Sequence, residues 1–199
     1  MKGLWVMSKT RIEAFTDAVI AIIMTILVLE LKAPEKASWS ALAGMEHKIL
    51  IYIVIFITLG IYWNNHHHMF QVVHKIDGRV LWANNFLIFS LSLFPFSTAW
   101  IGDHLYSWAP EATYGFIVLL ANFAYYILAK ELVRANGHQS TVATLFKGYR
   151  KMYLSIALNV VALLLGWLIA PICVLIVNVL ILFIWLIPEK KVEIHYKEN

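Results

Sequence analysis

The first long apolar segment constrains the fold of this chain most strongly, because charged residues stand at its entrance. Residues 18–31 are apolar apart from one acid, and Arg11 and Asp17 lie just before them. Residues 11–31 together reach about 20 residues, the length of a helix that spans ~30 Å of hydrocarbon. Ionisable groups at such depth cost roughly 2.5–3.5 kcal/mol each on insertion scales, and they usually face protein or water. We therefore expect this helix to lie inside a bundle and beside an aqueous path.

The composition predicts an all-α membrane protein that crosses the bilayer several times. Hydrophobic residues make up 61% of the 199 residues and charged residues only 14%, against roughly 25% charged in a soluble domain. The single cysteine, Cys173, lies in an apolar run, so neither an internal disulfide nor a thiolate metal site is possible. The net charge of +4 reports membrane orientation in such a chain, so a nucleic-acid partner is not expected.

Six apolar segments have the length and composition of transmembrane helices. They cover residues 8–31, 45–74, 80–101, 113–135, 146–168 and 171–187. Residues 1–188 are then one six-span unit, and residues 189–199 form a charged cytoplasmic tail. The loops between these spans are short, so an enzyme is the least favoured class and no cofactor is expected.

Basic residues predict that both termini lie on the inner side of the membrane. With that orientation 13 of the 16 Lys and Arg residues fall in inner segments, and only Lys32, Lys36 and Lys48 fall outside. An excess of Lys and Arg on the cytoplasmic side is the usual determinant of topology.

One face of the first helix admits two interpretations. Ile22, Thr25, Ile26 and Leu29 follow the offsets of a single helical stripe, and this stripe continues inward through small alanines. If several copies surrounded an axis, the stripe would form apolar rings above a wider vestibule. Small residues also permit close helix packing, and the residue pattern alone favours that second interpretation.

Asp17 lies on another face of the same helix and needs polar partners inside the subunit. The second span carries Trp63 and His67 on one stripe, and the third span opens with Asn84. Asn and His are suitable donors to a buried carboxylate. We expect a network of Arg, Asp, His and Asn side chains that fixes the rotation of the first helix.

Three consecutive histidines, His66, His67 and His68, stand beside this predicted network. Neighbouring positions on a helix diverge by 100°, and helical metal pairs use the i, i+4 spacing. We therefore expect no metal site here, and the pattern leaves open which of the three histidines meets Asp17.

The run Arg11-x-x-x-Phe15-Thr16-Asp17 resembles the Arg-x-x-x-Phe-Ser-Asp signature of the transmembrane protein 175 family of potassium channels, which occur in animal endolysosomes and in bacteria. The likeness extends to Trp63 with the histidines that follow it, to Asn84, and to residues 93–98. Thr16 departs from the usual serine but keeps the hydroxyl group. The ordinary potassium-channel filter sequence Thr-Val-Gly-Tyr-Gly is absent from the chain.

The resemblance implies a bacterial homotetramer in a prokaryotic plasma membrane, with potassium as the permeant ion and the first helices lining a central pore. By this likeness Ile22 forms the narrowest ring, Ile26 and Leu29 form further apolar rings, and Thr25 is a polar layer. The residues implied to orient the pore helix are Arg11, Phe15, Thr16, Asp17, Trp63, His67 and Asn84. The resemblance shifts the interpretation of the stripe towards a pore. Two other functions stay open: a proton-coupled secondary transporter, suggested by the intramembrane ionisable residues, and a membrane scaffold or sensor without a pore.

Overall fold

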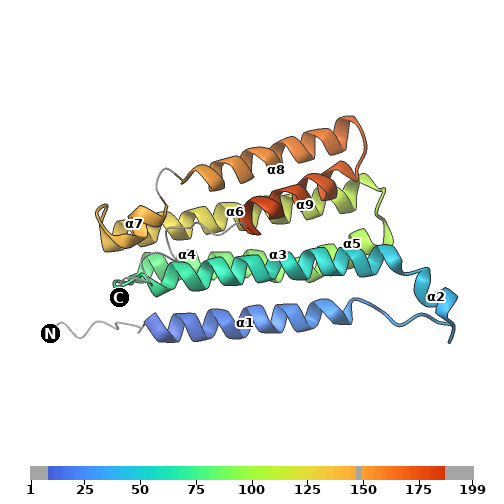
Figure 1. Ribbon diagram of the computed structural model, residues 1–199, viewed down its shortest axis with the longest axis horizontal. Coiled ribbons are helices and arrows are strands. Elements are labelled where there is room, and N and C mark those ends of the chain that lie inside the picture. Colours follow the sequence, from blue (N-terminus) through green and yellow to red (C-terminus); the bar gives the residue numbers. More distant parts are fainter. Residues whose placement is uncertain (1–8, 147–148, 187–199) are drawn as a thin grey trace.

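The computed structural model describes residues 9–146 and 149–186, and within these ranges the chain forms helices joined by turns and short loops. The long helices lie along the length of the molecule, and successive ones run in opposite directions (Figure 1). In chain order the helices are α1 (Lys9–Leu29), α2 (Trp39–Ala43), α3 (Glu46–Gln71), α4 (Gly78–Ser92), α5 (Phe94–Asp103), α6 (Trp108–Asn136), α7 (Thr141–Leu145), α8 (Arg150–Leu168) and α9 (Cys173–Leu186).

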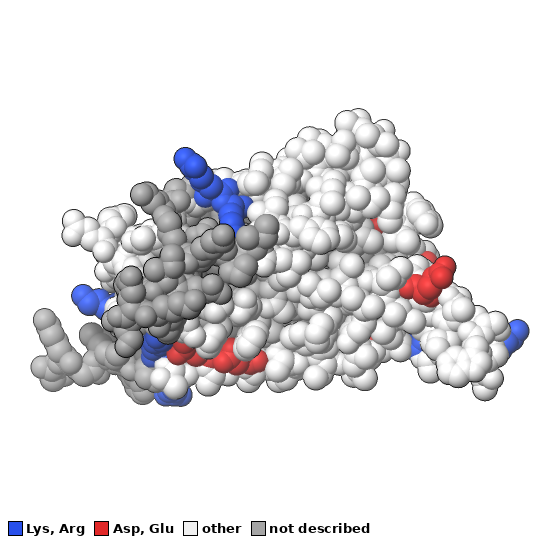
Figure 2. Space-filling model, in the orientation of Figure 1, with Lys and Arg blue, Asp and Glu red and all other residues white. Residues whose placement is uncertain are grey.

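Within the described residues, five segments are long and apolar enough to cross a membrane. Four of them are the single helices α1, α3, α6 and α8, and the fifth is α4 joined to α5. The helix α9 is apolar but has only 14 residues, about 21 Å at 1.5 Å per residue. Figure 2 shows Lys, Arg, Asp and Glu side chains towards the two ends of one face, with a broad uncharged area between them. The predicted all-helical membrane fold is confirmed, whereas the count of six spans stays a prediction.

The third predicted span, residues 80–101, is divided in the structure between α4 and α5 at Leu93. Pro95 stands in the first turn of α5 and has no backbone N–H to donate to residue 91, so the helical hydrogen bonding is interrupted there. The two helices still form one apolar segment of membrane length, Gly78–Asp103.

Other helix ends differ from the predicted ones by a few residues. The helix α3 ends at Gln71 instead of residue 74, because the backbone N–H groups of His74 and Lys75 donate to the side-chain oxygen of Asn136 at 2.9 and 2.8 Å. The helix α6 begins at Trp108, and α8 begins at Arg150 after the short helix α7. The predicted tail, residues 189–199, lies outside the described residues.

The helix α6 packs against α4, α5, α8 and α9, whereas α1 contacts α3, α4 and α5 and lies along one side of the bundle (Figure 1). The α1 residues that face the bundle are buried: Ile12, Thr16, Ile20, Ile23 and Leu27. This arrangement fixes which face of α1 remains uncovered by its own subunit.

Candidate functional site: the uncovered face of α1

The predicted pore stripe lies on the uncovered face of α1. Ile22, Ile26 and Leu29 are 55%, 42% and 73% exposed, and Thr25 is exposed between them. The Thr25 hydroxyl donates to the carbonyl of Ile22 at 2.8 Å, so its oxygen keeps lone pairs on the open side. The structure therefore presents all four residues to whatever surrounds the subunit.

The same face continues along the predicted inner half of α1. Arg11 and Phe15 are exposed, together with the alanines at positions 14, 18 and 21. This half is lined by small side chains between Phe15 and Ile22. The uncovered face therefore has small side chains between Phe15 and Ile22 and large apolar ones from Ile22 to Leu29.

Behind this face a chain of buried polar groups joins α1 to α3 and α4. Asn84 donates from Nδ2 to the hydroxyl of Thr16 at 2.9 Å, and the Nε2 of His66 donates to Oδ1 of Asn84 at 2.8 Å. All three side chains are buried, and the His66 ring stacks on Phe70. Polar groups removed from water are stabilised only when they are paired, so these bonds fix one arrangement of the three helices.

A second polar contact joins α1 to α3 one residue further along. The indole N–H of Trp63 donates to Oδ1 of Asp17 at 2.9 Å. The ring of His67 stacks on Trp63 with an interplanar angle of 16°, and its Nε2 accepts from the Gln71 amide at 2.7 Å. At the end of α3, Lys9 donates to the backbone carbonyl of Gln71 at 3.0 Å. Asp17 is therefore held by an indole rather than by a histidine.

The structure brings together most of the residues predicted for the network and changes their pairing. Thr16 and Asn84 meet directly, and so do Asp17 and Trp63. His67 supports Trp63 by stacking instead of reaching Asp17, while Arg11 and Phe15 lie on the exposed face. His66, one of the three histidines that the sequence offers as a partner for Asp17, bonds Asn84 instead.

The three histidines contribute no metal-binding cluster within residues 9–146 and 149–186. Cys173, at the start of α9, is a free thiol and is partly buried. Neither feature adds a chemical group to the uncovered face of α1.

Polar contacts also hold the loop between α3 and α4 against the end of α6. Asp77 caps α4 by accepting from the backbone N–H groups of Arg79 and Val80, and it forms an ion pair with Arg134. The hydrogen bond from Arg134 is the main reason why the pKa of Asp77 lies below its usual value. These contacts anchor the end of α3 that carries the histidines.

These features define a class of protein: a multi-pass, all-helical membrane protein in which one helix, oriented by buried polar bonds, leaves a full-length face uncovered. Residues 11–95 match the family described as endosomal/lysosomal potassium channel TMEM175. A potassium channel of Chryseobacterium sp. (strain P1-3) is 44% identical over 193 residues, which are 97% of this chain and 100% of that protein.

Solved and animal relatives agree with this match. The crystal structure of a lysosomal potassium-selective channel TMEM175 homolog from Chamaesiphon minutus covers 89% of this chain and 95% of its own, with a TM-score of 0.77 and 26% identity. The human endosomal/lysosomal proton channel TMEM175 is 35% identical over 81 residues, 35% of this chain and 16% of that protein. The chain belongs to the TMEM175 family of potassium channels, which are not enzymes. For a prokaryotic member of this kind, the plasma membrane is the expected location.

Proposed function

We propose that the chain is a potassium-permeable, leak-type channel in which α1 helices from four identical subunits surround a central pore. The observation that carries this proposal is the uncovered face of α1, which runs from Arg11 to Leu29. Among the described residues, its own subunit packs against the opposite side of the helix, so one copy does not enclose an aqueous path along this face. Intramembrane ionisable residues mark ion or proton pathways by default, and Arg11 stands at the end of this face.

We place the constriction at rings formed by Ile22, Ile26 and Leu29. An isoleucine ring cannot replace the hydration shell of an ion, so a narrow ring of this kind excludes water and blocks ions by dewetting. Opening then requires the α1 helices to move apart or to rotate until a largely hydrated ion fits. Thr25 would supply the polar layer, since its oxygen retains acceptor capacity.

The polar bonds behind α1 would hold the pore helix in its working rotation. Interhelical hydrogen bonds in lipid are worth roughly 0.6–2 kcal/mol each. Such bonds join α1 to its neighbours at Lys9, Thr16 and Asp17. Because successive helical positions differ by 100°, a rotation of α1 that breaks these bonds would turn other side chains towards the axis.

A second candidate function is proton permeation or proton-coupled transport. It is favoured by the human relative, which is named a proton channel, and by the two ionisable side chains Asp17 and His67, which both contact Trp63. The transported ion therefore has to be measured and not assumed.

The decisive experiment measures potassium flux from liposomes that contain the purified protein, with Ile22→Asn beside the wild type. Ile176→Asn is the matched control, because Ile176 on α9 is 50% exposed and Ile22 is 55% exposed. We expect ohmic potassium flux that Ile22→Asn changes and Ile176→Asn does not. Equal flux in wild type and Ile22→Asn would remove Ile22 as the constriction. Flux that requires a proton gradient would support the transporter, and no flux in any variant would support a scaffold.

A further inference from the structure

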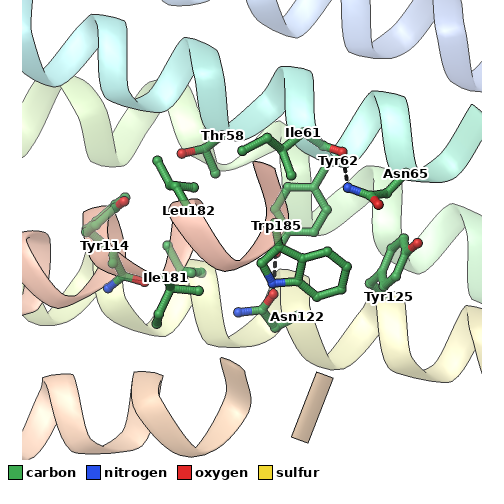
Figure 3. Close-up of a pocket in the computed structure, with 12 residues that line it drawn as sticks. Thr58, Ile61, Tyr62, Asn65, Tyr114, Asn122, Tyr125, Ile181, Leu182 and Trp185 are labelled. Atoms are coloured by element: carbon green, nitrogen blue, oxygen red, sulfur yellow. Dashed lines mark hydrogen bonds between the residues drawn. The ribbon is translucent and has the colours of Figure 1, made fainter. Parts of the chain in front are cut away.

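A partly open cavity of about 40 Å³ lies between α3, α6 and α9, on helices other than the one that carries the uncovered face (Figure 3). None of its 12 described lining residues is an acid, a base or a histidine. Apolar atoms make up most of its surface, but neutral polar groups from all three helices reach it. The polar lining includes Tyr62 and Asn65 from α3, Asn122 and Tyr125 from α6, and Asn178 and Trp185 from α9.

The hydrogen bonds of the three asparagines use only part of their capacity. Asn65 and Asn178 each donate one amide N–H to a carbonyl of their own helix at 2.8 Å. The Asn122 oxygen accepts from the Tyr62 hydroxyl at 2.7 Å. An asparagine side chain offers two donors and an acceptor with two lone pairs, so each of the three amides has further groups to offer on the cavity side.

The position of these amides makes unused polar groups costly. The helices α3 and α6 have membrane-spanning length and composition, and bulk water does not reach the hydrocarbon region. An unpaired amide or hydroxyl in apolar surroundings costs roughly 1–3 kcal/mol in proteins. A ligand that both donates and accepts hydrogen bonds would remove this cost.

The volume of the cavity limits the size of the ligand that it can hold. A buried water molecule needs roughly 10–15 Å³ of cavity volume and two to four polar partners. Cavities that stay empty are apolar. About 40 Å³ therefore gives room for on the order of two or three water molecules. We propose that this cavity is an internal hydration site, in which water molecules bridge the amides of Asn65, Asn122 and Asn178.

The proposed site adjoins the helix that orients α1. Tyr62 joins α3 to α6 at the cavity, and the next residue, Trp63, holds Asp17 of α1. The water molecules fill the space between α3 and the peripheral helix α9. The hydration site does not depend on which ion, if any, passes along α1.

Hydroxyl-radical footprinting with X-ray irradiation tests the proposal, because radicals form from water in place and oxidise the side chains next to it. The full-length protein in lipid nanodiscs is irradiated, and oxidation of each residue is measured by mass spectrometry with correction for intrinsic reactivity. We expect Tyr62 and Trp185 to be oxidised several-fold faster than Phe70, a fully buried aromatic residue of α3 outside the cavity lining. Oxidation at the level of Phe70, as expected for a cavity that is dry or filled by a lipid chain, overturns the proposal.

Two variants determine whether the oxidation comes from this cavity. Ile181→Phe fills the space with a larger apolar side chain from α9 and keeps the Tyr62–Asn122 bond. Asn122→Leu removes one of the proposed water ligands. Both should lower oxidation of Tyr62 and Trp185 to the level of Phe70. Unchanged oxidation in Ile181→Phe overturns the proposal, and this variant decides the matter even if Asn122→Leu does not fold.

Discussion

Replacing Thr16 by valine should destabilise the subunit through one hydrogen bond. Valine has nearly the shape of threonine and the same β-branching, but it cannot accept from Asn84 Nδ2, which bonds the Thr16 hydroxyl at 2.9 Å. Thr16 is fully buried and Asn84 is 1% exposed, so water does not take the place of the lost acceptor. The substitution therefore leaves a buried amide N–H without that partner.

The expected loss of stability in Thr16→Val follows from two ranges of free energy. A buried donor left unpaired costs about 1–3 kcal/mol in proteins, and interhelical polar contacts in membranes measure roughly 0.6–2 kcal/mol. We expect Thr16→Val to lower the free energy of unfolding by about 1–2 kcal/mol. Thr16→Ser keeps the hydroxyl and removes one methyl group, whose burial from water is worth at most ~0.8 kcal/mol. The loss is smaller in this assay, because the helix of the unfolded protein remains among the apolar chains of lipid and detergent.

The assay is unfolding by SDS in mixed micelles, followed by tryptophan fluorescence at one fixed protein concentration. Thr25→Val is the matched control, because Thr25 lies exposed on the same helix and its hydroxyl bonds only its own backbone. In an Asn84→Leu background the Thr16→Val change should cost almost nothing, since the interaction is already absent. A serine variant as unstable as the valine variant, or a valine variant as stable as the wild type, would refute the reasoning.

Three further changes probe other contacts. Trp63→Phe should cost roughly 0.6–2 kcal/mol in the same SDS assay, because phenylalanine loses the bond to Asp17 but retains a ring that can stack on His67; no change would show that the indole bond is not needed. Gly166→Ala should destabilise by about 1–3 kcal/mol, because its Cβ would stand 2.5 Å from Val174 and 3.0 Å from Trp108. Gly60→Ala, whose Cβ meets nothing within 4 Å, should be neutral or stabilising, and equal effects at both glycines would contradict the packing argument. Asp77→Asn should slightly lower the melting temperature at pH 7, where the ion pair with Arg134 is intact. The pKa of Asp77 is depressed in the folded protein, so its contribution is full above about pH 4, the ordinary value of an unfolded aspartate. The contribution is lost as the pH falls through the lower folded value, and a difference that grew on acidification would contradict the assignment.

The uncovered face of α1 was predictable because helical periodicity places residues on a face without reference to tertiary structure. Ile22, Ile26 and Leu29 share a stripe in the sequence, and the same three side chains are exposed in the structure. The sequence could not tell whether that stripe packs against a neighbouring helix of the same chain. That question depends on which helices lie beside α1, and α3, α4 and α5 all pack on its other side.

The pairing within the polar network was less predictable for a geometric reason. Trp63 and His67 share a stripe, and this stripe does face Asp17, but only the indole N–H of Trp63 bonds the carboxylate. His66, displaced by 100° from its neighbour, faces α4 and bonds Asn84. A sequence signal for His66 did exist, because it shares a helical face with Leu59, Tyr62, Met69 and Phe70, which are all buried.

The break in the third span carried a sequence signal too, since Pro95 lies inside the predicted range of 80–101. A proline within a helical segment interrupts it a few residues earlier, and the structure divides α4 from α5 at Leu93. The apolar composition alone predicts one continuous helix there. Composition reports membrane depth, whereas backbone donors decide where a helix is interrupted.

The helix α3 connects the candidate site to the rest of the subunit. Within five consecutive residues, Tyr62 bonds Asn122 of α6, Trp63 bonds Asp17 of α1, and His66 bonds Asn84 of α4. These contacts leave α3 in three different directions, so α3 cannot rotate without breaking at least one of them. Each break would leave polar groups unpaired among apolar helices, at a cost of the order of 1 kcal/mol or more. A change in the rotation of α1 would therefore require either the loss of its bonds at Thr16 and Asp17 or a joint movement of α1 with α3 and α4.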